Sequence, residues 1–427
     1  MNIKKMLSIP VVFLIAVCVL TGCSKKDQSP AARSGGPLTI KVAVWDTTLN
    51  PYYGELVRAF ESAQSNIKVE IIDTPQADYT QKLSVMLNGG SDIDAFWIKD
   101  GDTTKGLSSR GQLADLSSYI RQDAIDLSVY NGLAERFNMD GKIVALPAST
   151  SYYVLFYNKD VFDKAGAAYP SNDLTWTQWE QIARQLTSGS GNDKIWGAHF
   201  HTWQALVQNW AVQDGKHSIV ETDYGFMKPA YDMVLRLQNA GVIQDFGSLK
   251  AGNIAYANAF IKGNVAMLPM GFWLAATIKD RIDKGEASLN WGVATIPHPE
   301  GVPAGWTVGS VTPIAINQAS KKKDAAWEFL KFTTSEDGAR IYAKNATFPS
   351  RANNENLTDI ANVPGMPSGI LDALVVKNIA LDRPMVDYVA EVNQMLGEEH
   401  SLIMLKEVTV DQGLANMAKR SREIQGK

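Results

Sequence analysis

Cysteine is nearly absent from this chain, which has only Cys18 and Cys23 among its 427 residues. Cys18 lies inside the apolar run from Leu7 to Leu20, so no cysteine pair is left for the rest of the chain. We therefore expect no disulfide and no cysteine nucleophile in the folded protein. An oxidising compartment is permitted, but the core must be stabilised by burial alone.

Several catalytic motifs are also missing. The sequence has no glycine-rich loop of the phosphate-binding types and no Gly-x-Ser-x-Gly nucleophile turn. His199 and His201 flank Phe200, but two histidines without further nearby ligands are more often structural than metal-binding. We therefore expect a protein without catalytic residues, cofactor or metal.

Basic residues are slightly outnumbered, at 41 against 45 acidic residues. Removal of residues 1–22 takes away Lys4 and Lys5, which leaves 39 basic residues and a net charge of −6. A nucleic-acid partner requires a clustered basic surface, so this balance disfavours that class of function.

The first residues have the pattern of an export signal. Lys4 and Lys5 precede the apolar run, which is shorter than the roughly 20 residues that span a bilayer. Small residues follow at its end, directly before Cys23. We expect residues 1–22 to be a lipoprotein signal peptide and Cys23 to carry acyl chains such as palmitate, which anchor the protein to a membrane. An ordinary secretory signal or an uncleaved anchor are the alternatives.

Residues 23–36 are polar or small and have no apolar periodicity, so we expect a flexible tether. The chain after the signal is too long for one compact core, which predicts two lobes. Its first part alternates between strand and helix patterns. The expected elements are a strand at 38–44, a helix around 53–60, a strand at 69–72, a helix at 79–88 and a strand at 95–98. This order predicts a parallel sheet with helical crossovers.

The second part continues the alternation with a different sequence. Asn158 is placed to cap a helix that ends at Gly166, and Thr177 and Glu180 have the spacing of a capping box for the next helix. Further strands are expected at 154–157, 265–268, 291–296 and 311–316. The second lobe is therefore also α/β.

Tryptophan is abundant, with 11 residues. Trp45 and Trp97 stand at the carboxyl ends of predicted parallel strands, where open α/β sheets collect their ligands. Asp46 and Asp100 lie close to them in sequence. A flat ring beside a hydrogen-bond acceptor suits a sugar, which has apolar faces and a rim of hydroxyls.

Other tryptophans divide between the core and a binding site. Trp203 begins a predicted helix, so the sequence favours neither burial in the core nor ligand contact for its side chain. Trp273 and Trp306 lie near glycines, which let a backbone approach a ligand closely, so we favour ligand contact for both. The tryptophans on apolar helical stripes are assigned to the core, namely Trp179, Trp210 and Trp327.

A series of short motifs, each loose alone, follows in a fixed order along almost the whole mature chain. They are Ile67-Lys68-Val69-Glu70, Tyr79-Thr80-Gln81-Lys82-Leu83, Asp140-Gly141-Lys142 leading to Ala145-Leu146-Pro147, 157–166, Thr175-Trp176-Thr177, Phe260 with 263–267, and 325–330. In this order the chain resembles the extracellular solute-binding proteins of carbohydrate-uptake ABC transporters, the maltose-binding-protein-like family.

The resemblance implies a type II periplasmic-binding-protein fold, with two lobes, hinge crossovers and a ligand cleft between the lobes. The lobes it implies are 37–147 plus 292–345 and 148–291 plus 346–427. Each lobe would contain a mainly parallel sheet flanked by helices. Closure on a sugar would be followed by docking on membrane permease subunits.

The resemblance also assigns site residues. The stretch from Phe96 to Asp100 is similar to the family segment that supplies an aromatic platform and a sugar-binding acid, which supports Trp97 and Asp100. Gly101 stands where maltose binders commonly have arginine, so the ligand need not be maltose. Trp273 and Trp306 fall in the family's binding loops. Arg351, after Pro349 and Ser350, is a candidate for binding a hydroxyl or a charged substituent.

Together these inferences predict a monomeric, lipid-anchored receptor on the extracytoplasmic face of the membrane that captures a sugar or oligosaccharide for an ABC importer. One alternative is a binder of a charged metabolite such as a glycerol phosphate ester, with Arg351 holding the anion. Another is a surface glycoside hydrolase, for which Asp92 and Asp94, or Asp100 and Asp102, would supply the carboxylates. An adhesive or sensory lipoprotein is the last.

Overall fold

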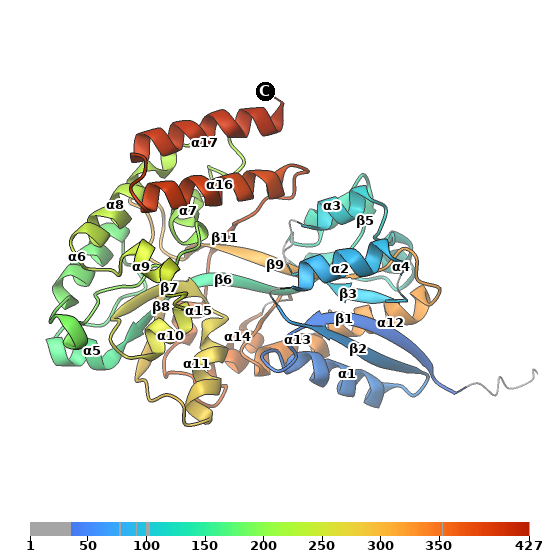
Figure 1. Cartoon of the computed structure of the whole chain (residues 1–427). Coiled ribbons are helices and arrows are strands. Elements are labelled where there is room, and N and C mark those ends of the chain that lie inside the picture. The colour runs from blue at the N-terminus through green and yellow to red at the C-terminus, as the bar shows by residue number, and fades with distance from the viewer. Residues whose placement is uncertain are drawn as a thin grey trace, which may run out of the picture. The chain divides into compact units, whose positions relative to one another are not determined.

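The computed structural model describes residues 36–76, 78–90, 92–99, 103–130, 132–351 and 353–426. The predicted signal peptide, Cys23, nearly all of the predicted tether and Asp100 lie outside these residues. Residues from Pro37 onward form a single folded unit (Figure 1). Within the described ranges, none of the helices is both long and apolar enough to cross a membrane.

The first part of this unit alternates between strands and helices. In order, its elements are β1 (Leu38–Trp45), α1 (Tyr52–Ala63), β2 (Ile67–Thr74), α2 (Tyr79–Asn88) and β3 (Ala95–Trp97). Strand β1 pairs in parallel with β2 on one side and with β3 on the other. Helix α1 buries Tyr53, Leu56 and Phe60, which belong to the stripe that predicted it. The predicted parallel unit is therefore confirmed.

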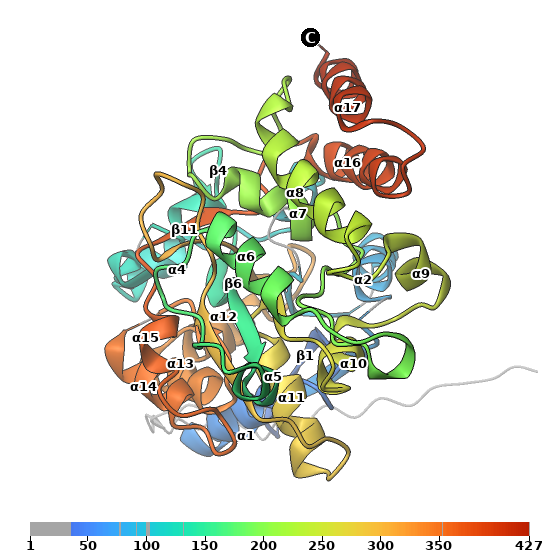
Figure 2. The ribbon, with the colours of Figure 1, turned by 90° about the vertical axis from the view of Figure 1, so that its left-hand side faces the viewer.

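A group of short elements leads from this unit to a long strand. They are α3 (Thr103–Ser109), α4 (Ser117–Gln122), β4 (Asn138–Met139), β5 (Lys142–Ile143) and β6 (Leu146–Asn158). The elements that follow are α5 (Lys159–Ala165), α6 (Trp176–Leu186), α7 (Ala205–Val212), α8 (Lys228–Asn239), α9 (Phe246–Ala251), α10 (Tyr256–Ile261), β7 (Met267–Gly271), α11 (Leu274–Asp283) and β8 (Trp291–Thr295). Figure 2 views the molecule from the side that carries α5, α6 and α10.

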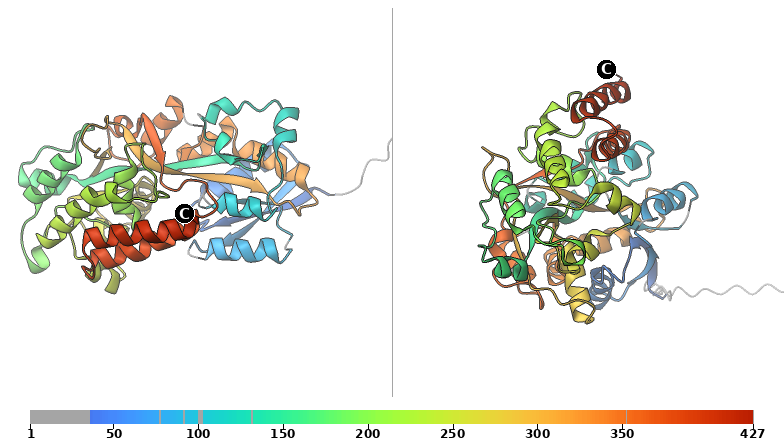
Figure 3. Two further views of the ribbon diagram at one scale, coloured as in Figure 1. Left: turned by 90° about the horizontal axis from the view of Figure 1, so that it is seen from above. Right: turned by 60° about the vertical axis from the view of Figure 1, so that its left-hand side comes forward.

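The last part returns along a second long strand. Its elements are β9 (Trp306–Ile316), α12 (Lys323–Thr333), α13 (Glu336–Lys344), β10 (Phe348–Pro349), α14 (Asn354–Ala361), α15 (Leu371–Leu374), β11 (Asn378–Leu381), α16 (Val389–Met404) and α17 (Val410–Gln425). Helices α16 and α17 pack against each other, and α17 also packs against α8 (Figure 3).

Side-chain caps mark the start of some helices, among them α5 and α6. The Asn158 side chain accepts hydrogen bonds from the backbone N–H groups of Asp160 and Val161, and α5 is followed by Gly166 at φ 63°, as predicted. The capping box of α6 is formed by Thr175 and Gln178, not by Thr177 and Glu180. Thr175 has the extended backbone that an N-cap requires, whereas Thr177 already lies within the helix.

The main sheet has the strand order β10-β6-β9-β3-β1-β2, with β11 beside β9 and with β7 and β8 beside β6. Strand β6 runs from the first core into the second. Strands β7, β8 and β9 run in the opposite direction, so each of them pairs with β6 in antiparallel fashion. The α/β class is confirmed, and among the named strands parallel pairing joins β1 to β2 and β3 and joins β9 to β11.

Two clusters of buried apolar side chains divide the unit. The first core contains residues of 40–148, 311–316 and 325–342. The second core contains residues of 152–296, Val308 and 343–417. The chain therefore passes between the cores within β6, within β9 and near the end of α13, and Figure 1 shows β6 and β9 side by side.

The predicted lobe boundaries after 147 and after 345 lie close to two of these crossings. The predicted return of the chain to the first lobe at 292 differs from the structure, because β8 packs in the second core. The return takes place within β9 instead. The sequence offers no marker for this point, since β8 and β9 are both strongly apolar strands.

Candidate functional site

Four aromatic side chains meet on the second core, and we call His201, Trp203, Tyr256 and Trp273 the aromatic wall. The Trp203 ring stands edge-on to His201 and to Tyr256, with centroid distances of 4.6 Å and 5.3 Å. The Trp273 indole N–H donates a hydrogen bond of 3.1 Å to the Tyr256 hydroxyl. The wall thus combines the segment before α7 with the first residue of α10 and the residue before α11.

The wall is partly open to solvent. Trp203 is 40% exposed, one of the largest exposures for an aromatic side chain in the described ranges, and the other three side chains are half-buried. Burial lowers the pKa of His201 to about 4, and the charge of Lys250 acts in the same direction. The imidazole is therefore neutral at physiological pH, so the wall is a largely apolar surface edged by one hydroxyl.

Buried rings behind the wall fix its orientation. Tyr153 on β6 stands edge-on to Trp273 at 5.6 Å and to Trp210 at 5.5 Å. Gly271 at the end of β7 lies directly against the Trp273 indole, and a Cβ atom there would come within 1.9 Å of the ring. Only glycine lets the indole fold back against this strand. Packing against Tyr153 and Gly271 therefore fixes the orientation of the Trp273 indole.

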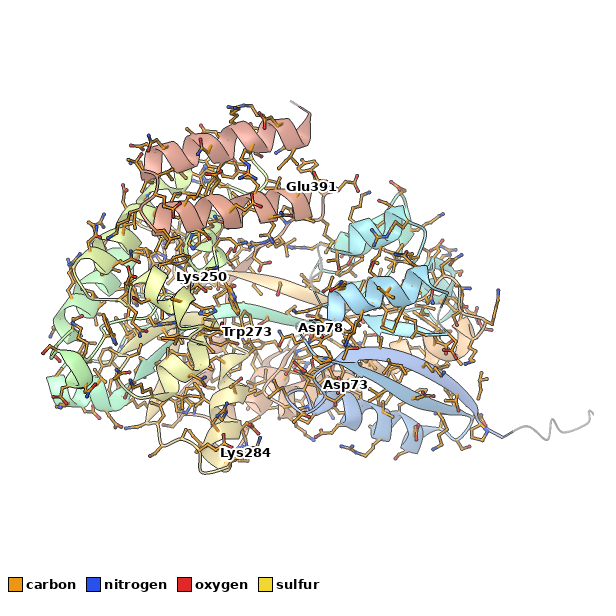
Figure 4. All side chains as sticks on the ribbon, in the orientation of Figure 1. Asp73, Asp78, Lys250, Trp273, Lys284 and Glu391 are labelled. Atoms are coloured by element: carbon orange, nitrogen blue, oxygen red, sulfur yellow. The ribbon has the colours of Figure 1, made fainter. Side chains whose placement is uncertain are left out.

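Two aspartates follow or end neighbouring strands of the first core. Asp46 follows β1 with the left-handed φ of 44°, and its carboxylate accepts no hydrogen bond from the described residues. Asp73 accepts a bond of 2.6 Å from the Thr47 hydroxyl. Figure 4 shows Asp73 and Asp78 on the first core and Trp273 on the second, with all three labels in the middle of the view.

The structure places two predicted platform residues in the first core. Trp97 is 1% exposed, stands edge-on to Tyr53 and Phe329, and donates a hydrogen bond of 3.1 Å to Tyr342. Trp45 is 8% exposed and contacts Tyr79 at 5.0 Å. Neither indole offers a face to a ligand, so we correct the expectation that they stack on one.

The physical reason is the position of their strands. β3 lies between β1 and β9 in the middle of the sheet, and Trp97 at its end packs against Tyr53 of α1 and Phe329 of α12. A side chain at the carboxyl end of such a strand is still covered when a neighbouring helix extends past it, as α12 does with Phe329 over Trp97. A position at the carboxyl end of a parallel strand is therefore not enough to predict that a tryptophan side chain is exposed.

Trp306 and Arg351 are also engaged within the protein. The Trp306 ring packs over Gly215, where a Cβ atom would come within 2.7 Å of it, and the Trp306 carbonyl accepts a bond of 2.7 Å from Gln213. The Arg351 guanidinium pairs with Glu336 at 3.3 Å. Neither residue lies in the aromatic wall, and a paired Arg351 gives no support to an anion clamp.

The sequence predicts only part of the wall. Trp203 and Trp273 are predicted ligand-binding residues, whereas no pattern marks Tyr256 and the sequence favours a structural role for His201. The signal for His201 is its position two residues before Trp203. His199 is buried and contacts Gln244 at 3.0 Å, which agrees with a structural role. Trp179, Trp210 and Trp327 are buried, as predicted.

Among the described residues no group of three or more histidine, cysteine, aspartate or glutamate side chains is placed to hold a metal ion. The arrangement that remains is a half-exposed aromatic surface on the second core. Together, the two-core α/β fold and this surface define a solute-binding protein of the type II periplasmic class.

The comparison with known proteins gives the family. The model of the bacterial extracellular solute-binding protein family matches residues 46–340. The chain belongs to this family, and it is a binding protein rather than an enzyme.

Solved structures share the fold over most of its length. A sugar transporter of Rhizobium etli, crystallised in an open conformation, is 38% identical, with 90% of this chain and 99% of that chain covered and a TM-score of 0.82. An ABC substrate-binding protein of Listeria monocytogenes in complex with cycloalternan is 25% identical, with 91% and 99% covered and a TM-score of 0.79. A curated relative, the maltooligosaccharide ABC transporter solute-binding lipoprotein of Streptococcus pneumoniae, is 26% identical over 79% of this chain and 78% of its own length.

Proposed function

We propose that this protein captures a sugar or oligosaccharide and delivers it to the permease of an ABC importer. The relatives support the ligand class, because they include a maltooligosaccharide-binding lipoprotein and a protein solved with cycloalternan. The observation that carries the proposal is the aromatic wall. Trp273 is held from behind by Tyr153 and Gly271, and Trp203 exposes 40% of its surface.

The wall suits the apolar faces of a pyranose ring. An exposed indole can stack on the C–H face of a sugar, and the Tyr256 hydroxyl, which accepts a hydrogen bond from Trp273, can still donate one to a sugar hydroxyl. The ring orientations are set before ligand arrives, so little entropy is lost on binding. Trp203 and Trp273 are thus the proposed stacking residues.

The acidic residues of the first core are the proposed polar partners. A carboxylate accepts hydrogen bonds from two sugar hydroxyls, and such charge-assisted bonds are stronger than neutral ones. Asp46 is suited to this role because its carboxylate has no partner among the described residues. Asp100, which lies outside the described residues, remains a predicted partner.

Ligand capture would take place by closure of the two lobes. β6 and β9 are the long strands that connect the cores, so they are the natural hinge elements. A sugar that contacts the wall on one side and Asp46 on the other interacts more strongly in the closed state. That difference in affinity alone would shift the equilibrium towards closure.

Membrane attachment completes the proposal. Cleavage after residue 22 and acylation of Cys23 would tether the monomeric protein to the extracytoplasmic face of the membrane through residues 23–36. A tethered protein meets its permease at a raised effective concentration, so a modest affinity between the two suffices. Incorporation of labelled palmitate into the wild-type chain, and its loss in Cys23→Ser, would test this anchor.

A thermal-shift screen tests the ligand class. The chain from Lys25 onward contains the whole folded unit, and it would be screened against maltotriose, raffinose, mannotriose and glycerol 3-phosphate. At least one oligosaccharide should raise the melting temperature, because a ligand that binds only the folded state stabilises it. Stabilisation by glycerol 3-phosphate alone, or by none of the compounds, would contradict the proposal.

A further inference from the structure

A second concave surface lies on the second core and contains none of the aromatic-wall residues. Its volume is about 380 Å³. Most of its polar lining comes from amide side chains, together with one indole and one lysine, and we call it the amide pocket: Asn192, Trp196, Gln244, Asn258, Lys262 and Asn264. Figure 2 shows α10, which supplies Asn258, on the side of the molecule that faces the viewer.

Many polar groups of the amide pocket are free to bind a ligand. The side chains of Asn192 and Asn258 form no hydrogen bond with any residue that the structure describes, and Lys262 has no acidic partner there. Gln244 uses its carbonyl oxygen in the contact with His199, which leaves its amide N–H groups. Asn264 donates to the Lys194 carbonyl at 3.1 Å, which leaves its side-chain oxygen. Donors and acceptors are therefore both available.

The indole of Trp196 gives the pocket an apolar surface. The Lys194 ammonium lies 5.1 Å from the centroid of this ring. The backbone of Trp196 is fixed on both sides, because its N–H donates to Asn264 and its carbonyl accepts from Ala266, each at 2.9 Å. The backbone position of Trp196 beside Asn264 is therefore fixed, and its half-buried indole lines the same pocket as the amides. A flat ring beside amide groups matches the apolar face and the hydroxyl rim of a sugar.

The volume of the amide pocket limits the size of the ligand that it can hold. Sites for small molecules span roughly 300 to 1,000 Å³. The amide pocket lies at the lower end of this range, so it suits one sugar ring rather than an oligosaccharide. Amides dominate its polar groups, and they pair with neutral hydroxyls.

We propose that the amide pocket is a second binding site, which takes a single neutral monosaccharide independently of the aromatic wall. Trp196 would contact the face of the sugar ring, and the free amide groups of Asn192, Gln244, Asn258 and Asn264 would bind its hydroxyls. This site goes beyond the proposed function, which requires only the wall and the first core.

Helix α10 connects the two sites, since it carries Tyr256 of the wall and Asn258 of the pocket. An effect of Asn258→Ala on the pocket must therefore be separated from an effect on the wall. Asn258 is exposed, and its side chain forms no hydrogen bond with the described residues, so we expect its truncation to leave the fold and the Trp273 to Tyr256 bond intact. Asn239→Ala, at the end of α8, removes an equally exposed amide away from the pocket and serves as the matched control.

The test follows the indole N–H resonance of Trp196 by NMR, assigned through its loss in Trp196→Phe. D-glucose is titrated into the Trp203→Ala variant, in which the wall is impaired. We expect a saturable shift of this resonance, with affinity reduced about fivefold by Asn258→Ala, the loss expected for one neutral hydrogen bond, and unchanged by Asn239→Ala. An unshifted Trp196 resonance, or equal titrations in the two asparagine variants, would overturn the proposal.

Discussion

The indole nitrogen of Trp273 and the hydroxyl of Tyr256 form a hydrogen bond of 3.1 Å that joins the residue before α11 to the start of α10. Tyr256 also contacts Trp203, at a ring centroid distance of 5.3 Å. One side chain therefore links the half-buried and the exposed tryptophan of the wall. The wall is a connected unit, and its members can be tested separately.

Tyr256→Phe removes this hydrogen bond and keeps the ring. The Trp273 N–H then loses its partner in a half-buried position, which costs roughly 1 to 3 kcal/mol of folding free energy. We expect a measurable decrease in the urea midpoint and a weaker oligosaccharide affinity, because Trp273 is no longer held in one orientation. Calorimetry and urea unfolding on the same preparation give both values. An unchanged midpoint would mean that the hydrogen bond has little weight.

Trp203→Ala should separate binding from stability. Trp203 is 40% exposed, so its truncation leaves little cavity in the core. We expect the oligosaccharide identified by the thermal-shift screen to bind at least about tenfold more weakly, equal to about 1.4 kcal/mol of binding free energy, at a nearly unchanged melting temperature. Tyr169→Ala removes a side chain of similar exposure, at 44%, from a site outside the wall and is the control. Equal affinities of Trp203→Ala and the wild type would remove Trp203 from the site.

Much of the fold could be predicted from the sequence because periodicity and capping are local. Helix α2 begins and ends at the predicted residues, Tyr79 and Asn88. The stripe of α1 and the cap of α5 at Asn158 were visible in the same way. The point at which the chain returns to the first lobe could not be predicted in this way. The sequence predicts a return at 292, but β8 belongs to the second core because it pairs with the part of β6 that lies there.

The site was less predictable, because exposure of a tryptophan is a property of tertiary packing. Trp97 ends an apolar strand and Trp273 closely follows another, but Phe329 of α12 covers Trp97, whereas Gly271 lets Trp273 turn back along the preceding strand. Tyr256 was missed because nothing near it in sequence marks its contact with Trp273. These contacts join segments that are distant in sequence, and no local pattern indicates that they meet in the fold.

Trp97→Ala is expected to affect stability and not specificity. The indole is 1% exposed, and its loss would leave a large cavity and an unpartnered Tyr342 hydroxyl. We expect a decrease of about 3 to 5 kcal/mol in the free energy of unfolding, typical of a buried aromatic truncation. The fraction that remains folded should bind oligosaccharide with wild-type affinity. The milder Trp97→Phe allows the same measurement if the alanine variant fails to fold.

Gly271→Ala tests the position of the Trp273 indole. The added Cβ atom would come within 1.9 Å of the ring, so the ring has to move away from β7. We expect the tryptophan fluorescence to change and oligosaccharide affinity to decrease about tenfold or more, since a displaced indole loses about 1.4 kcal/mol or more of stacking energy. Gly285→Ala, with no atom near its Cβ position, adds a methyl group elsewhere as a steric comparison, although its φ of +70° makes some loss of stability expected. Normal affinity in Gly271→Ala would show that binding does not depend on this ring.

Buried histidines should make the protein less stable in mild acid. Burial lowers the pKa of His199 to about 4 and of His400 to about 3, whereas an unfolded histidine has a pKa of about 6.5. Below about pH 6.5 the unfolded chain therefore binds protons that the folded protein does not, so stability is full above this pH and falls down to about pH 4.

The expected slope is up to about 1.4 kcal/mol per pH unit for each such histidine, reduced where water reaches the ring. Urea unfolding at several values between pH 7 and pH 4.5 would measure it. His400→Gln removes one of these groups but keeps a polar side chain within reach of Tyr231, which contacts His400 at 3.2 Å. Carboxylates contribute equally to both proteins, so the difference between their slopes isolates His400. Identical slopes would show that His400 does not titrate as its burial requires.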